Sequence, residues 1–219
     1  SATSGSATSI NVSLTGVANA SSYTARIYLA SDTSTALQTI TSFTSGSAIT
    51  ALTAGTAYVV SITAIGDGIS YADSSASALS SSITTNAAAA TPTVSAPTSA
   101  SKNVGATHRF SSSATVSDAG TLNYQWQVST DSGSNWSDIS GATAVDYTTA
   151  TLVIGDSAKQ YRMGAINSKN GTTTTAYSSA ATLTVTRTTL GTPVTPTGSA
   201  TSGSATSINV SLTGVANAS

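Results

Sequence analysis

The chain has 219 residues, a net charge of −1 and no cysteine, and only 7% of its residues are charged. Seven basic and eight acidic residues give no basic surface for nucleic acid, and without cysteine there is neither a disulfide nor a thiolate metal site. No apolar run reaches the roughly 18 residues of a membrane-spanning helix, so the sequence predicts no membrane span.

The remaining composition favours an ordered β protein. Hydrophobic residues make up 39% of the chain, and threonine, valine and isoleucine are frequent. A disordered chain usually combines high net charge with few β-branched residues, and this chain has neither property. Strands are therefore the predicted elements.

The first 21 residues, SATSGSATSINVSLTGVANAS, return without a change at residues 199–219. A fixed period indicates a tandem array. The period of 198 residues suits two domains of about 100 residues each. We therefore predict that residues 1–198 are one repeat and that residues 199–219 begin the next.

In the first unit, apolar and polar residues alternate over residues 10–14 and 23–29, and this period of two predicts half-buried strands. Residues 52–64, LTAGTAYVVSITA, then resemble the fibronectin type III pattern L-x-P-G-T-x-Y-x-V-x-V-x-A, although Ala54 replaces the proline. The resemblance covers about residues 10–87. It implies a β-sandwich in which the hydroxyl of Tyr58 bonds to nearby backbone, and a last strand over residues 77–85.

The same resemblance places a proline-containing lead-in before the first strand. Residues 192–197, TPVTPT, resemble that lead-in, but they lie at the other end of the chain. The first unit, residues 1–87, is therefore expected to lack its first strand or to receive it from a preceding copy.

Residues 86–92, NAAAATP, read as a short linker to a second unit, because small residues and a proline form no core. Residues 124–143, YQWQVSTDSGSNWSDISGAT, resemble the immunoglobulin-like repeats of large bacterial surface proteins, and the resemblance covers about residues 92–187. It implies that Trp126 is buried and that Tyr161 is a corner tyrosine. It also implies that Phe110 and Met163 fill the places of the two cysteines of disulfide-bonded relatives.

Motifs for catalysis are absent from the sequence. There is one histidine, His108, predicted as a partly buried strand residue, and there is no G-x-S-x-G, phosphate loop or H-E-x-x-H. Asp131 and Asp138 bracket a turn and are weak candidates for Ca²⁺, but ordinary turn roles are favoured without D-x-D-x-D-G spacing. Neither an enzyme nor a cofactor is predicted.

Together these features predict an all-β protein with two sandwiches in tandem, one fibronectin type III-like and one immunoglobulin-like. The predicted bounds are 1–87 and 88–188, with residues 189–219 forming a linker and the first strands of the next repeat. The predicted function is a structural repeat of an extracellular bacterial fibre or giant cell-surface adhesin. The alternatives are a carbohydrate-binding array and accessory domains of a secreted polysaccharide-degrading enzyme.

The expected partners are neighbouring copies of the repeat, with surface glycans as a further possibility, and no nucleic acid. Two assemblies stay open: one covalent array, or separate chains that complete each other by strand addition. Each separate chain would carry two copies of the strand around Ile10 but only one position in a sandwich for it, so one copy would have no partner. The covalent array is therefore favoured.

The scarcity of charge predicts how copies of the chain associate side by side. Neither like-charge repulsion nor large hydrated side chains oppose contact, so association should respond weakly to salt. Light scattering across an ionic-strength series measures this response. A steep salt dependence would show instead that the few charges control contact.

Overall fold

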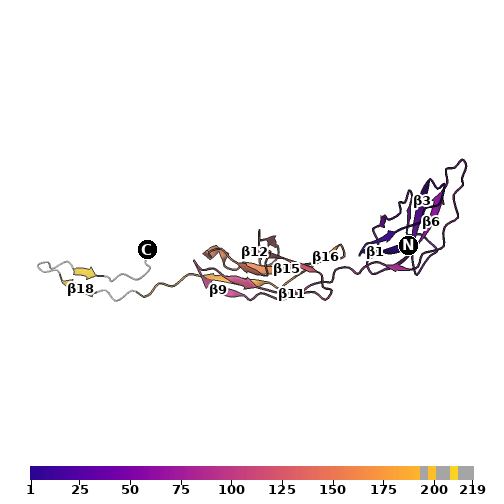
Figure 1. Ribbon diagram of the computed structural model, residues 1–219. Coiled ribbons are helices and arrows are strands. Elements are labelled where there is room, and N and C mark those ends of the chain that lie inside the picture. The colour runs from indigo at the N-terminus through magenta and orange to yellow at the C-terminus, as the bar shows by residue number, and fades with distance from the viewer. Residues whose placement is uncertain (193–196, 201–207, 212–219) are drawn as a thin grey trace.

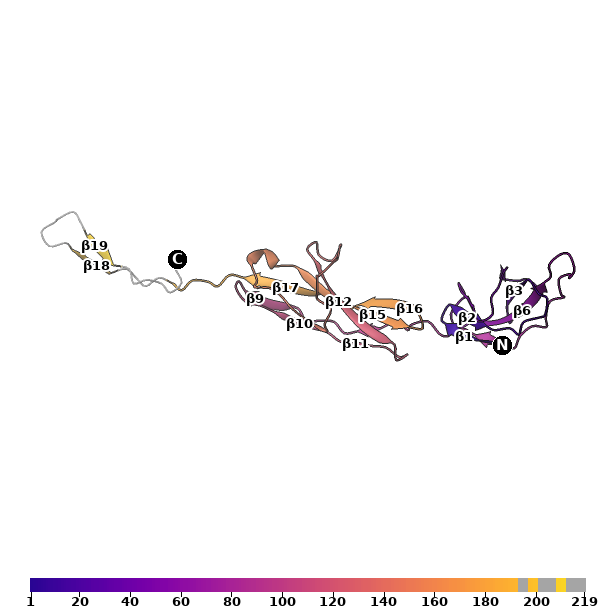
Figure 2. The same ribbon diagram turned by 45° about the horizontal axis from the view of Figure 1, so that its top comes forward.

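The computed structural model describes residues 1–192, 197–200 and 208–211. Apart from a short 3₁₀ turn, η1 (Ile154–Asp156), the regular elements in these ranges are strands. They build two sandwiches, each with its own hydrophobic core, that follow one another along a line (Figures 1 and 2). The prediction of an all-β sandwich fold is confirmed, and the bounds predicted for the two domains stay predictions.

Two sheets form the first sandwich. The smaller sheet has the order β1 (Ala2–Ser6), β2 (Ser9–Val12), β5 (Ala48–Ile49). The larger sheet has the order β4 (Gln38–Ile40), β3 (Ser22–Leu29), β6 (Ala57–Ile65), β7 (Ile83–Thr84). Neighbouring strands are antiparallel in both sheets.

The period of two in the sequence sets which side chains fill the first core. Ile10 and Val12 of β2 are buried, as are Ala25 and Ile27 of β3, while the residues between them reach toward solvent. Because successive side chains of a strand point to opposite faces, each strand contributes alternate residues to the space between the sheets. Tyr58 of β6 completes this core and is 2% exposed.

The position of the first strand differs from the sequence prediction. The sequence predicts that the first strand of residues 1–87 is missing or supplied by a preceding copy. In the structure β1 lies beside β2, and Ala2 is opposite Val12. The short polar run before Ile10 turns back at Ala7 and Thr8 and forms the edge strand itself, so residues 1–87 do not lack a first strand; a contribution from a preceding copy stays a prediction.

The end of the first sandwich also differs, because residues 73–81 do not form a regular strand. Three serines spaced three residues apart each donate their backbone N–H to a carbonyl of β6, and each Oγ accepts the N–H of that same β6 residue. The pairs are Ser74 with Ala64, Ser77 with Ile62, and Ser80 with Val60, at 2.8–3.0 Å. We call residues 73–81 the serine segment. The last strand predicted over residues 77–85 is thus reduced to β7, because serine side chains replace half of the backbone ladder.

The second sandwich has a larger main sheet. Its order is β13 (Ser137–Asp138), β12 (Thr121–Ser129), β15 (Gln160–Lys169), β17 (Ala181–Thr186), β9 (Ala100–Asn103), and β16 (Thr172–Tyr177) also pairs with β15. Two short pairs face it: β10 (Arg109–Ser111) with β14 (Asp146–Thr148), and β8 (Thr93–Val94) with β11 (Ala114–Thr115). The β17–β9 pair is parallel and the others are antiparallel.

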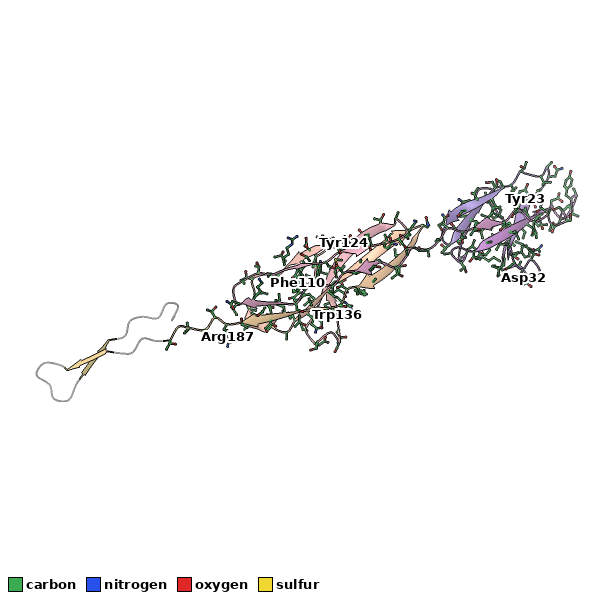
Figure 3. The ribbon with its side chains drawn as sticks, turned by 90° about the horizontal axis from the view of Figure 1, so that it is seen from below. Tyr23, Asp32, Phe110, Tyr124, Trp136 and Arg187 are labelled. Atoms are coloured by element: carbon green, nitrogen blue, oxygen red, sulfur yellow. The ribbon has the colours of Figure 1, made fainter. Side chains whose placement is uncertain are left out.

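Aromatic side chains from both layers fill the second core. The ring of Phe110, from β10, stacks on Tyr161, from β15, with 4.6 Å between the ring centroids. Trp126 is fully buried, lies opposite Met163 in the β12–β15 ladder, and donates its indole N–H to the carbonyl of Ala144. Phe110, labelled in Figure 3, and Met163 are at most 1% exposed and belong to the same core.

Two further strands lie near the end of the chain, the first beginning just before the repeated segment and the second within it. β18 (Thr197–Ala200) pairs antiparallel with β19 (Ile208–Ser211). Ala200 lies opposite Ile208, whereas the equivalent Ala2 lies opposite Val12, the equivalent of Val210. The two copies thus form the same hairpin with a register that differs by two residues.

Replacing Trp126 tests the arrangement of the second core. We expect Trp126→Ala to lower the free energy of unfolding by about 3–5 kcal/mol, because it leaves a cavity where a large buried side chain was. Chemical denaturation of the full chain, followed by circular dichroism, measures the loss. Trp136→Ala is the matched control, since Trp136 is only partly buried, and its loss should be smaller. A loss below about 1 kcal/mol for Trp126→Ala would contradict this packing.

Candidate functional site at the junction of the two sandwiches

The two sandwiches meet where the hairpin of β15 and β16 reaches the β1–β2 turn. The backbone N–H of Ala7, in that turn, donates to the carbonyl of Asn170 at 2.8 Å, and Ala7 is fully buried. Asn170 and Gly171 have φ of 51° and 78°, as the two central residues of a tight hairpin turn require. The turn therefore places a backbone carbonyl of one sandwich against the other. Figures 1 and 2 show the end of the β15–β16 hairpin pointing toward the first sandwich.

The same hairpin binds the chain that links the sandwiches. The side chain of Asn170 donates to the carbonyl of Ala87 at 2.9 Å. Ala89 is held on both sides: its N–H donates to Thr172 Oγ1 at 2.8 Å, and its carbonyl accepts from Thr174 Oγ1 at 2.9 Å. Alternate residues of β16 point to one face, so both threonines face the linker.

Ala90, next along the linker, is held by Asn167 and Asp118. Its N–H donates to a carboxylate oxygen of Asp118, and its carbonyl accepts from the Asn167 amide, both at 2.8 Å. The Asn167 amide nitrogen also lies 3.1 Å from both oxygens of Asp118. This hydrogen bond from Ala90 is the main cause that lowers the pKa of the Asp118 carboxyl below its usual value.

Asn167 is fully buried, and its position depends on a glycine. A Cβ at Gly120 would lie 2.0 Å from Asn167 Oδ1, so only glycine fits beside the amide. Oδ1 itself has no hydrogen-bond partner among the described residues. The amide is thus held by its nitrogen alone, in a site shaped for the Ala90 carbonyl.

The first sandwich holds the start of the linker in the same way. The N–H of Asn86 donates to the carbonyl of Ser6 at 3.1 Å, and Ser4 Oγ donates to Asn86 Oδ1 at 3.0 Å. The carbonyl of Asn86 accepts from the N–H of Gly55 at 3.1 Å. Residues 86–90, which the sequence identifies only as a linker, are therefore bound to both sandwiches. We call these contacts the junction.

The residues that the sequence singles out lie away from the junction. The Tyr58 hydroxyl accepts from the N–H of Thr53 at 2.9 Å, a bond to nearby backbone of the kind that the fibronectin resemblance implies. Tyr161 packs between Phe110 and Tyr147, and its burial raises the pKa of its hydroxyl to about 12. Within the described residues no hydrogen bond joins the Tyr161 hydroxyl to the backbone, so its contribution is packing.

The two candidate calcium ligands serve local structure. The carboxylate of Asp131 accepts the backbone and side-chain N–H groups of Asn135 and the hydroxyl of Ser129, and these bonds lower its pKa to about 2. Asp138 accepts from the amide of Gln127 at 2.7 Å. Across the ranges that the structure covers, no three His, Cys, Asp or Glu side chains gather as a metal site.

Sequence reasoning missed the junction, although one signal for it is present. The dipeptide Asn170-Gly171 between two strand-like runs is the strongest short-range indicator of a tight hairpin. The contacts of the hairpin with the linker have no such signal, because single threonine and asparagine residues are common throughout this chain.

A family model described as Domain of unknown function (DUF8696) matches residues 79–187, which contain the end of the serine segment, β7, the linker, the junction hairpin and the second sandwich. No curated protein matches the chain.

Similar solved structures include a marsupial T cell receptor, 10% identical, with a TM-score of 0.39 over 90% of this chain and 73% of that one. A structure of chicken CNTN1 FN1–FN3 domains is 15% identical, with a TM-score of 0.32 over 94% of this chain and 71% of that one. A segment of two fibronectin type III domains from chicken tenascin is 15% identical, with a TM-score of 0.32 over 83% and 96%.

The bond between Ala90 and Asp118 predicts a pH dependence of the junction. Because the bond lowers the pKa of the carboxyl, it stabilises the junction fully above the ordinary pKa of 3.8 and is lost as the pH falls through the lower folded value. The amide resonance of Ala90 should therefore stay constant near neutral pH and shift with a midpoint below 3.8. In Asp118→Asn this titration should vanish. A midpoint at or above 3.8 in the unaltered chain would contradict the assignment.

Proposed function

We propose that this chain is a structural repeat of an extracellular bacterial fibre or giant cell-surface adhesin, in which it acts as a spacer and an assembly module. The junction carries the proposal. A flexible tether would need no contacts, whereas here Asn86, Ala87, Ala89 and Ala90 are hydrogen-bonded to one sandwich or the other. Such a linker suits two sandwiches that must keep a fixed relative orientation.

The path of the chain supports a linear arrangement of copies. β1 runs toward Ser6 at the junction, and the first sandwich ends there, at Asn86. Arg187, just after β17, lies at the end of the second sandwich that is remote from the first (Figure 3). The repeated 21 residues follow. A successive copy would thus continue the line, with an advance of roughly 70 Å per repeat if each sandwich is roughly 35 Å long.

The proposal includes neighbouring copies of the same repeat as partners, an extracellular or cell-surface location, and no catalytic role. Small, uncharged side chains allow close lateral contact at little cost in desolvation. His108 is partly buried against Phe110, and burial lowers its pKa, as for a packed strand residue. No helix in the described residues could span a membrane.

A carbohydrate-binding array remains the second candidate, because the second sandwich presents aromatic rings on its outer face. The guanidinium of Arg162 lies over the rings of Trp136 and Tyr177, 4.2 and 4.1 Å from their centroids. Arg162 therefore covers one face of each ring, and a sugar would have to use the other faces. A glycan screen, repeated with Trp136→Ala, decides between the candidates, since retention that this variant abolishes would favour the carbohydrate-binding array.

Native material tests the array directly. If copies are joined in one chain, boiling purified fibres in detergent should leave species much larger than the 21.4 kDa of this chain. A ladder that starts at that mass, with no very large species, would replace the covalent array by strand exchange between separate chains.

The stiffness of the junction is the prediction that follows from the spacer role. NMR relaxation of the full chain should give one rotational correlation time for both sandwiches. Thr174→Val removes the hydrogen bond to the Ala89 carbonyl, at a cost of about 1 kcal/mol, and should increase relative motion of the sandwiches.

Thr175→Val is the matched control, because Thr175 is exposed on the opposite face of β16 and should leave the motion unchanged. Independent tumbling of the two sandwiches in the unaltered chain would contradict the spacer role.

A further inference from the structure

The first sandwich has an open apolar groove between its two sheets. The groove has a volume of about 340 Å³ and is lined by Val12, Leu14, Tyr23, Val60, Ile62 and Ala64, together with the serine segment. Leu14, Tyr23 and Ile62 are only half-buried, although all three pack against the core (Figure 3 labels Tyr23). Ser1 and Ala2 also line it, so the groove opens where a chain preceding Ser1 would run.

We propose that residues 189–198 of a preceding copy occupy this groove, as a continuation of β1. This inference rests on the proposed array, because only there does such a segment precede Ser1. Within this chain, residues 189–198 directly precede Ser199, the equivalent of Ser1. β18 begins at Thr197, so in the second copy the edge strand does extend upstream of that serine, in a register two residues away that places Thr197 opposite Ser211, the equivalent of Ser13.

The register of β1 determines which residues of the segment would face the groove. Ser1 and Ser13 exchange both backbone hydrogen bonds, at 2.6 and 2.7 Å, and Ala2 packs against the core. Residues of the same parity as Ala2 therefore face inward. Counting upstream with Ser199 as Ser1, these are Gly198, Pro196 and Val194, of which the last two are apolar.

Backbone hydrogen bonding fits the same register over residues 196–198, whereas Pro193, at an odd position, would lie opposite Asn19 in the turn beyond the paired region. On an antiparallel edge strand, N–H groups point alternately to the partner strand and away from it. Ser1 is at an odd position, and its nitrogen points to β2. Pro196 is at an even position, so its nitrogen points away from the sheet, and its missing N–H costs no hydrogen bond to β2. Thr197, at an odd position, would lie opposite Thr15. The Thr15 N–H has no hydrogen-bond partner among the described residues.

The test is the full chain with an additional copy of residues 189–198 placed before Ser1. We expect the Thr15 amide to exchange its hydrogen at least about tenfold more slowly in the extended chain than in the original one, because it gains a backbone partner. In the added segment, Val194→Asp should remove most of this protection, since a charge would enter the groove. Thr195→Asp is the matched control, because its side chain faces solvent, and it should keep the protection.

Three results would overturn the inference. The first is an unprotected Thr15 amide in the extended chain. This result would not affect the spacer role, which is tested separately by NMR relaxation and by the gel of native fibres. The second is equal loss in the two aspartate variants, because the groove would then not be the binding site. The third is protection that appears in the original chain as protein concentration rises, which would make the tail of a separate chain the occupant.

Discussion

Hydrogen bonds between short polar side chains and backbone groups stabilise this protein in the serine segment and at the junction, where its strands do not pair. A buried backbone N–H or carbonyl without a partner costs free energy, so each irregular stretch needs a substitute for the ladder. In the serine segment the substitutes are Ser74, Ser77 and Ser80. At the junction they are the threonines and asparagines of the β15–β16 hairpin.

The need for these side-chain hydrogen bonds explains why the chain is rich in serine and threonine. Serine and threonine are short enough to reach a neighbouring backbone group, and they lose little conformational entropy when they do. The same device recurs in the second sandwich, where Ser178 donates its N–H to the Met163 carbonyl and accepts the Met163 N–H with its Oγ. The chain can therefore form two complete sandwiches with 7% charged residues.

The sequence predicts those parts of the fold in which the type of a residue is enough to determine whether it is buried or exposed. Alternating apolar residues identify the core strands, and Tyr58 and Trp126, which the sequence singles out, are buried in the two cores. The serine segment escapes prediction because its period of three matches neither strand nor helix. The edge strand β1 escapes because it is short and polar, and only the partner β2 makes it a strand. The junction escapes because it depends on contacts between residues about 80 positions apart, such as Asn167 with Ala90.

The spacing of the serine segment limits how this part of the chain can change in length. Ser74, Ser77 and Ser80 pair with every second residue of β6, so three residues of the segment span two of the strand. Losing one residue between Ser74 and Ser77 would place Ala78 where a hydroxyl must accept the N–H of Ile62, and the edge of β6 would lose that partner. Losing a Ser-x-x unit would keep the remaining serines in phase. Insertions and deletions in the serine segment should therefore occur in multiples of three residues when the sequences of related repeats are compared.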